Sequence, residues 1–307
     1  MSSSDPKFVS GFVSIVGRPN AGKSTLLNAL VGTKLAIVAD KPQTTRTSIQ
    51  GVLTSEEGQV VFLDTPGIHD ADSVINRRMM DTVREALQER DLLILVADAT
   101  RPIDAGDREA VELVKRTGTP CLLALNKIDL VKAKSHLLAP LDGYQQLHEF
   151  REYLPVSAKS GEGIAALGKA VMAALPEGPA YFPPDHITDQ PERFLAAELI
   201  REQILQETRL EVPHSVAVVV DQWTDDKTIT RVEATIYVER AGQKGILIGA
   251  GGERLKRIGT LARQEMELLL DRRFYLNLFV KVRPKWRENP AFLSSLDWRT
   301  MAGSDAP

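Results

Sequence analysis

The 307-residue sequence contains one cysteine, five histidines and few aromatic residues, 6% in all. A single cysteine excludes internal disulfides and is typical of a reducing compartment. The histidines are scattered without the spacing of a metal site. No apolar run approaches the length of a membrane-spanning helix, about 18 residues, and the first residues lack the apolar core of a signal peptide. The sequence therefore predicts a cytoplasmic protein of about two domains.

Charge is unevenly distributed along the chain. The formal net charge is −3, yet residues 244–287 hold 11 Lys and Arg against four Asp and Glu. This segment is thus +7 and the remainder −10. A basic segment in an acidic protein predicts a local surface for a polyanion. The alternative is an ordinary solvated helix face.

An apolar run at residues 12–16 leads into a glycine-bounded turn and then into the helical pattern of residues 26–30. The turn matches G-x-x-x-x-G-K-[ST], a phosphate loop whose backbone N–H groups converge on phosphate oxygens. We expect Lys23 to reach the β- and γ-phosphates of a nucleotide and the Ser24 hydroxyl to bind Mg²⁺. The candidate nucleotide-binding residues here are Gly17, Arg18, Pro19, Asn20, Ala21, Gly22, Lys23, Ser24 and Thr25.

Short apolar runs alternate with helical patterns through about residue 176, which predicts a doubly wound α/β domain with a mostly parallel sheet. Strands are expected at residues 59–63, 92–96, 121–125 and 153–156. Each is followed by a polar side chain, and the carboxyl ends of parallel strands meet at one edge of a sheet. We therefore expect Asp64, Asp98, Asn126 and Ser157 to surround one pocket.

Two further stretches are candidates for the phosphate end of this pocket. A threonine in residues 42–47 could supply a second hydroxyl to Mg²⁺, although a plain polar loop is an equal alternative. Asp64 opens Asp-Thr-Pro-Gly directly after a strand, where an acidic residue holds Mg²⁺. Gly67 could donate its N–H to a γ-phosphate, because a side chain there would obstruct the approach. Thr65 and Pro66 complete this candidate segment.

Base identity is predicted from Asn-Lys-Ile-Asp at residues 126–129. A buried carboxylate at Asp129 would accept from two donors of guanine, and adenine cannot supply both. The Lys127 stem can lie over the purine face. Backbone N–H groups of Ser157, Ala158 and Lys159 could meet the guanine oxygen. Guanine is therefore the expected base.

These motifs resemble the translation-factor-like GTPases in order and spacing and, within them, the Era family of bacterial ribosome-assembly GTPases. The shared phrases are GRPNAGKSTLLNAL, KPQTTRT, DTPGIH, NKID and VSAKSGEGI. The resemblance implies GTP and GDP as ligands, Mg²⁺ as cofactor, and Lys23, Thr45 and Gly67 as catalytic residues. It implies Ser24, Thr45 and Asp64 as Mg²⁺ ligands, with Thr44 as the alternative to Thr45.

The residue after Asp-x-x-Gly is Ile68, where many GTPases have a glutamine that orients the attacking water. That role is vacant here. Slow intrinsic hydrolysis is the physical expectation. Relatives with this substitution look K⁺-assisted, so the resemblance implies Asn20 as a K⁺ ligand.

Prolines and a glycine between residues 176 and 185 mark a domain boundary. A helix is expected at 191–207, strands at 215–220 and 228–238, a helix at 254–270 and a strand at 274–282. Before the second helix, Gly249 to Gly252 form G-x-x-G, the loop with which a KH domain clamps a nucleotide backbone. The candidate RNA-binding residues are Lys244, Ile246, Ile248, Gly249, Ala250, Gly251, Gly252, Arg254, Lys256 and Arg257.

This part of the chain, including residues 280–298, also resembles the Era family. The resemblance implies a type II KH domain that binds the 3′ end of small-subunit ribosomal RNA. The predicted organisation is a disordered N-terminus at 1–8, a GTPase domain at 9–177, a linker at 178–189, a KH domain at 190–290 and a tail at 291–307.

We therefore predict a GTP-hydrolysing switch that acts on the pre-ribosomal small subunit. One alternative is an RNA-binding scaffold that uses GTP as a structural ligand; a P-loop ATPase or small-molecule kinase is another, against which NKID argues. No obligate protein partner is evident from the sequence. The location is expected to be cytoplasmic, with peripheral contact with the inner face of the cell membrane as a further alternative.

Overall fold

The computed structural model describes residues 8–39, 41, 44–68, 73–208, 212 and 215–298. Residues 1–7, Pro42 and Gln43, and residues 299–307 of the predicted tail lie outside the described residues. The chain divides into two compact units. The first comprises Met1–Ala36, Thr45–Ala71 and Asn76–Asp189, and the second comprises Ile37–Thr44, Asp72–Ile75 and Gln190–Pro307. Each is described by itself.

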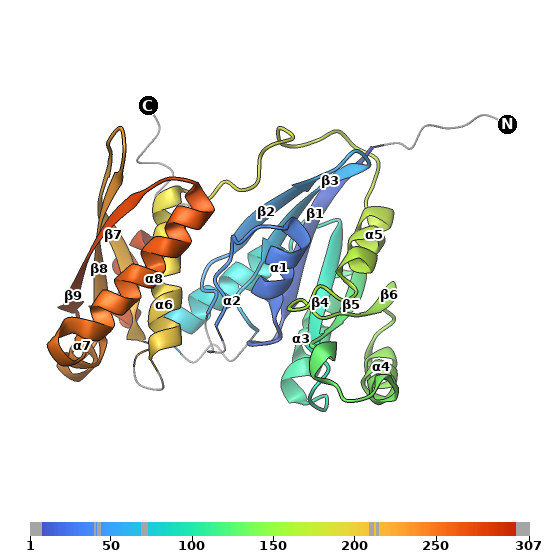
Figure 1. Cartoon of the computed structure of the whole chain (residues 1–307). Coiled ribbons are helices and arrows are strands. Elements are labelled where there is room, and N and C mark those ends of the chain that lie inside the picture. Colours follow the sequence, from blue (N-terminus) through green and yellow to red (C-terminus); the bar gives the residue numbers. More distant parts are fainter. Residues whose placement is uncertain are drawn as a thin grey trace. The chain divides into compact units, whose positions relative to one another are not determined.

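The first unit is an α/β layer structure around a six-stranded sheet of order β2-β3-β1-β4-β5-β6 (Figure 1). All neighbouring strands are parallel except β2 and β3. The strands are β1 (Val9–Gly17), β2 (Ile49–Thr54), β3 (Gly58–Asp64), β4 (Leu92–Asp98), β5 (Cys121–Asn126) and β6 (Glu152–Pro155). The helices are α1 (Lys23–Val31), α2 (Val74–Leu87), α3 (Ala105–Thr117), α4 (Leu138–Leu147) and α5 (Ile164–Ala174), with 3-10 turns η1 (Ile128–Leu130) and η2 (Lys134–Leu137). The predicted doubly wound fold is confirmed.

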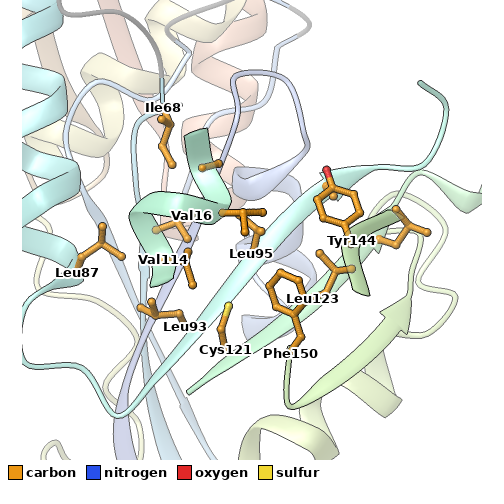
Figure 2. Close-up of a cluster of buried hydrophobic side chains, with 14 of the residues drawn as sticks. Val16, Ile68, Leu87, Leu93, Leu95, Val114, Cys121, Leu123, Tyr144 and Phe150 are labelled. Carbon is orange, nitrogen blue, oxygen red and sulfur yellow. The ribbon is translucent and has the colours of Figure 1, made fainter. Parts of the chain in front are cut away.

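One face of this sheet is sealed by α2, α3 and α4, whose apolar side chains form a buried cluster with the central strands. Figure 2 shows Leu93, Leu95 and Leu123 of the strands packing with Val114 of α3 and Tyr144 of α4. Strands buried on both faces read as continuous apolar runs, which is why the sequence located them. The cluster fixes the strand ends from which the polar side chains project.

The segment predicted as a linker lies against the first unit. The side chain of Gln59 on β3 accepts from the N–H groups of Tyr181 and Phe182 at 2.7 and 2.9 Å and donates to the Phe182 carbonyl at 2.9 Å. The Val52 N–H of β2 donates to the Ile187 carbonyl at 2.8 Å. These bonds attach much of residues 178–189 to the sheet edge instead of leaving a free tether.

The second unit has a three-stranded sheet of order β7-β8-β9, with β7 antiparallel and β9 parallel to β8. Its strands are β7 (Ala217–Asp225), β8 (Thr230–Val238) and β9 (Phe274–Val282). Its helices are α6 (Glu192–Glu207), α7 (Ala241–Ile248), α8 (Glu253–Leu270) and α9 (Pro290–Ser295), with 3-10 turns η4 (Ala250–Gly252) and η5 (Trp286–Glu288). Apolar side chains of α6, α7 and α8 pack on one face of this sheet.

Three elements were not predicted. The strand β2 is short and forms the antiparallel edge, and α7 contains Gly242 and Gly245, which have low helix propensity. The predicted order helix, strand, strand, helix, strand is therefore incomplete, because α7 stands before the glycine loop. The third is α9, which belongs to the predicted tail and buries Phe292 and Leu293 in the second unit.

Candidate functional site

The phosphate loop joins β1 to α1 through backbone conformations that require glycine. Gly17 has φ of 145°, and a Cβ there would lie 2.4 Å from the Val96 carbonyl oxygen. Gly22 has φ of 95°, and a Cβ there would lie 2.3 Å from the Asn126 side-chain nitrogen. The loop is thus wedged between neighbouring strand ends, and its N–H groups stand at the start of α1, where an anion is favoured.

Lys23 is folded across this loop. Its Nζ donates to the carbonyl of Gly17 at 3.1 Å and to that of Arg18 at 2.8 Å. Burial lowers the pKa of Lys23 to about 8, although Asp64 acts in the opposite direction. A phosphate placed in the loop would supply the negative charge that this buried ammonium lacks.

The side chain of Arg18 is held away from the loop. It forms ion pairs with Asp104 and, at 3.5 Å, with Asp107 at the start of α3. Arg101 pairs with the same two carboxylates. Arg18 therefore contributes its main chain to the candidate site, while its guanidinium is engaged elsewhere.

Three oxygen side chains from separate segments converge beside the loop. Ser24 Oγ lies 2.7 Å from Thr45 Oγ1 and 2.7 Å from Asp64 Oδ2, and Thr45 Oγ1 lies 3.2 Å from that same carboxylate oxygen. Burial raises the pKa of Asp64 to about 6, against the effects of Lys23 and of the two hydroxyl hydrogen bonds. The Thr44 hydroxyl instead donates to the carbonyls of Ala39 and Lys41, at 3.1 and 2.6 Å.

This oxygen cluster fits a divalent cation. Asp64 Oδ1 is buried and makes no hydrogen bond within the described residues, and an unsatisfied buried carboxylate oxygen is costly. Mg²⁺ favours oxygen ligands of this kind, two hydroxyls and a carboxylate, with phosphate oxygens and water completing its shell. Of the two threonines considered from the sequence, the structure brings Thr45 to the cluster.

The Asp-Thr-Pro-Gly segment is fixed against the phosphate loop. Thr65 Oγ1 donates to the Ile15 carbonyl at 2.9 Å, and the Ile68 N–H donates to the Gly17 carbonyl at 3.1 Å. A Cβ on Gly67 would lie 2.6 Å from the Pro19 nitrogen. Ile68 itself is only 3% exposed and belongs to the apolar cluster of Figure 2. Its side chain is therefore part of the core.

The candidate base site connects three loops through Asn126. Its Nδ2 donates to the Ala21 carbonyl and its Oδ1 accepts from the Ala158 N–H, both at 2.9 Å. The Ala158 N–H, one of the three that the sequence assigns to the guanine oxygen, thus also contacts Asn126.

The Asn-Lys-x-Asp segment positions its own side chains with two further contacts. Lys127 has φ of 68°, and its Nζ lies 2.7 Å from Asp98 Oδ2. Although burial works in the other direction, hydrogen bonds from Lys127 and Thr100 lower the pKa of Asp98. Asp129 accepts from Ser157 Oγ at 2.7 Å and is exposed. The expectation that its carboxylate is buried is wrong, because Asp129 lies in the turn η1 at the surface of the first unit.

The glycine loop of the second unit has left-handed conformations at three positions. Gly249, Gly251 and Gly252 have φ of 73°, 57° and 84°. A Cβ on Gly249 would lie 2.8 Å from that of Arg254. The loop exposes its backbone directly before the N-terminus of α8, so a phosphate can approach it closely.

A groove of about 300 Å³ runs between α8 and β9, beside this loop. Leu276 and Leu278 form its floor, and Gly259 leaves it open, since a Cβ there would lie 3.3 Å from the Leu278 side chain. Its lining residues are Leu255, Lys256, Gly259, Thr260, Arg263, Leu276 and Leu278. Of these, only Lys256 was singled out from the sequence. The spacing of positions 256, 259, 260 and 263 on one helical face was the available signal.

Several candidates around the loop have other partners. The Arg254 guanidinium donates to the Ile246 carbonyl at the end of α7. Arg257 pairs with Glu207 at 3.1 Å. Ile246 and Ile248 pack against the core of the second unit. Lys256 and Arg263 line the groove, and the Arg263 guanidinium pairs with Glu267 at 2.8 Å.

Comparison with known proteins assigns a different family to each of the two candidate sites. Residues 12–127 match the family described as 50S ribosome-binding GTPase, and residues 211–287 match the KH domain family. The chain is therefore a GTPase that carries a KH domain.

The chain is 50% identical over 288 residues to GTPase Era of Syntrophus aciditrophicus, covering 93% of this chain and 94% of that one. It is 47% identical over 296 residues to GTPase Era of Trichlorobacter lovleyi, covering 96% and 99%. The chain belongs to the Era family of GTPases.

Two solved structures share the whole fold. One is a point variant of Aquifex aeolicus Era bound to GDP·AlF₄⁻, and the other is Era in complex with MgGDPNP and nucleotides 1506–1542 of 16S ribosomal RNA. Each is 39% identical, has a TM-score of 0.92, and covers 95% of this chain and 99% of the other. None of the helices within the described ranges has the length and apolar character of a transmembrane segment.

Proposed function

We propose that this GTPase is a switch that binds the 3′ end of small-subunit ribosomal RNA and acts in assembly of the small ribosomal subunit in the cytoplasm. The observation that carries the proposal is the groove between α8 and β9, which is lined by leucines and two cations, together with the glycine loop that directly precedes α8. Single-stranded RNA is bound by this combination in KH domains. The related Era complex contains 16S ribosomal RNA, the RNA of the small subunit.

In the first unit we assign the phosphates to the loop of residues 17–25 and the base to Asn126, Lys127 and Asp129. Lys23 neutralises the β- and γ-phosphates from inside the loop. Ser24, Thr45 and Asp64 would hold Mg²⁺, which would polarise the phosphoryl oxygens as a Lewis acid. The contacts of Thr45 with Ser24 and Asp64 support its choice over Thr44.

Hydrolysis proceeds by attack of water on the γ-phosphorus, with cleavage of its bond to the oxygen that stays with GDP. Lys23 stabilises the charge that develops on the phosphoryl oxygens, and the Gly67 N–H donates to the γ-phosphate. Ile68 is buried in the apolar cluster and cannot orient the water. We therefore propose slow intrinsic turnover, accelerated by K⁺ bound near Asn20. The exposed Asn20 has a left-handed backbone, with φ of 61°.

RNA affinity of two matched variants tests the proposed function. Gly252→Asp places a carboxylate where a phosphate must approach, whereas Asp142→Asn on α4 changes one exposed charge in the first unit. The first variant should lose RNA binding and keep its GTP affinity, and the second should retain both. Unchanged RNA affinity in Gly252→Asp would place the RNA elsewhere.

A further inference from the structure

The face of the second unit's sheet that points away from α6 and α8 carries two exposed aromatic rings. Tyr275 is 51% exposed and Phe279 is 43% exposed, both on the edge strand β9. Side chains alternate along a strand, so these rings lie on the opposite face from Leu276 and Leu278, which line the groove. One strand therefore presents leucines to the groove and aromatic rings to its back.

Cations flank the rings on this back face. By the same alternation Lys281 projects beside them, and it is exposed. Arg231 stands opposite Tyr275 on β8, with its guanidinium carbon 5.5 Å from the ring centroid. Two acids also lie here: Glu233 is half-buried, and Asp221 accepts from Thr235 Oγ1 at 2.6 Å. Two cations and two acids thus lie on this face, and one of the acids is already engaged.

The covered end of this face provides a comparison. The ring of Tyr237 on β8 packs on Phe292 of α9, with 5.1 Å between centroids, and is half-buried. Arg283 also lies over Phe292, at 4.0 Å from its centroid. Where α9 covers the sheet, Tyr237 and Arg283 thus pack against Phe292 within the protein. Tyr275 and Phe279 remain exposed.

The arrangement suits nucleic acid better than protein. The cores of protein interfaces are depleted in charged residues, whereas here the rings are separated by Asn277 and bordered by cations. Four residues of strand separate the two rings by about 13 Å, so each can stack a different base. Aromatic rings bordered by cations are the usual platform for single-stranded RNA.

We propose that the back face of β9, formed by Tyr275, Phe279, Arg231 and Lys281, is a second RNA-binding surface that stacks unpaired bases. The inference rests on the proposed function. The glycine loop clamps about four nucleotides, so a longer RNA must continue beyond the groove. The exposed edge of β9 gives it a route from the leucine side of the strand to the aromatic side.

Affinity for a long and a short RNA tests this surface in the full-length protein. The long probe corresponds to nucleotides 1506–1542 of 16S ribosomal RNA. The short probe is the tightest-binding fragment of about six nucleotides from that segment, enough to fill a KH groove. Tyr275→Ala with Phe279→Ala removes both rings, and Tyr275→Phe with Phe279→Trp preserves the stacking. Leu138→Ala removes a 62% exposed apolar side chain from the first unit as the matched control.

We expect the double alanine variant to bind the long RNA at least about 5-fold more weakly, since stacking on one ring is worth about 1–3 kcal/mol per base. Its affinity for the short RNA should not change, and the aromatic variant and Leu138→Ala should match the wild type. Equal affinity for the long RNA, or an equal loss for both RNAs, would overturn the inference. Failure of the wild type to bind either RNA would overturn the proposed function, and this surface with it.

Discussion

Glu202 Oε1 accepts a hydrogen bond from the backbone N–H of Val38 at 2.8 Å, although the two residues are 164 positions apart. The next residue of α6 in the N-terminal direction, Arg201, donates to the Thr44 carbonyl. Both side chains are at most 2% exposed. Residues 37–44 therefore belong to the second unit, whereas the residue that follows them, Thr45, belongs to the first. A segment adjacent to the proposed Mg²⁺ ligand is thus held by α6 of the second unit.

Removing the hydrogen bond between Glu202 and Val38 should weaken the coupling between GTP binding and RNA binding. We expect wild-type protein to bind RNA more tightly with a non-hydrolysable GTP analogue than with GDP, by about 5- to 150-fold if the coupling is of typical size. Glu202→Ala should bring this ratio towards one, because residues 37–44 then lose an attachment to α6. The measurement is RNA affinity with each nucleotide at fixed salt.

Glu192→Ala is the matched control, since Glu192 lies on the same helix and pairs with Arg272 instead. It should keep the wild-type ratio. A Glu202→Ala protein that unfolds like the wild type and keeps the full ratio would exclude the attachment as the route of coupling.

The pKa of Asp64 predicts that Mg²⁺-dependent nucleotide binding weakens in acid. Burial raises this pKa to about 6, from about 4 in an unfolded chain. Asp64 therefore binds its proton more tightly in the folded protein than in the unfolded chain. The contribution of this proton to the free energy of unfolding is fully present below about pH 4 and is lost as the pH rises through about 6. Mg²⁺ needs the ionised carboxylate, so its binding has the opposite dependence.

Titration of a fluorescent GTP analogue between pH 5 and 8, with Mg²⁺ or with a chelator, measures this effect. The Mg²⁺-dependent gain in affinity should fall below about pH 6, by up to about tenfold per pH unit. Asp64→Asn should abolish the gain at every pH. A gain that stays constant down to pH 5 would mean that Asp64 does not hold the metal.

The motifs were predictable from the sequence because each is a short phrase with a fixed backbone requirement. The conformations of Gly17 and Gly22, and the place of Asp64 and Asn126 at strand ends, follow from local sequence alone. The predicted strand at 274–282 agrees with β9, since its residues alternate against a buried helix face.

Contacts between distant segments could not be read in the same way. The groove residues Gly259, Arg263 and Leu278 come from two elements whose register is set by tertiary packing. Arg18 and Arg254 carry the charge expected of phosphate ligands, yet acidic side chains and a backbone carbonyl engage them. Nothing in the sequence distinguishes a free arginine from a paired one.

Guanine specificity should depend on Asp129. Asp129→Asn reverses the polarity of one hydrogen bond to the base, so GTP should bind more weakly and xanthosine triphosphate more tightly. Competition against a labelled nucleotide gives both affinities. Wild-type protein that binds ATP as well as GTP would refute the assignment.

Hydrolysis should be faster in K⁺ than in Na⁺ if Asn20 ligates the cation. Asn20→Ala should reduce the rate in K⁺ to the rate in Na⁺ while leaving GDP affinity nearly unchanged, because the phosphate loop keeps its backbone donors. Steady-state turnover in matched chloride salts is the measurement. Equal wild-type rates in both salts would contradict the proposal.

Gly259→Ala should separate stability from RNA binding. Alanine in place of glycine inside a helix stabilises by about 0.5–1 kcal/mol, and the new methyl would lie 3.3 Å from the Leu278 side chain, which can rotate aside. The groove becomes narrower at its floor. We expect a higher midpoint of thermal unfolding together with weaker RNA binding and unchanged GTP affinity; stronger RNA binding would show that the groove is not the RNA site.

The burial of Ile68 limits how the rate of GTP hydrolysis can be controlled in this enzyme. In GTPases with a water-orienting glutamine after Asp-x-x-Gly, one side chain sets the pace and a single substitution can alter it. Here the same position supports the packing between β1, α2 and α3, and an amide placed there would have to be buried without its hydrogen bonds. The lifetime of the GTP-bound state is therefore not set by the side chain at this position, and a substitution here would disturb the core of the first unit before it changed the rate of hydrolysis.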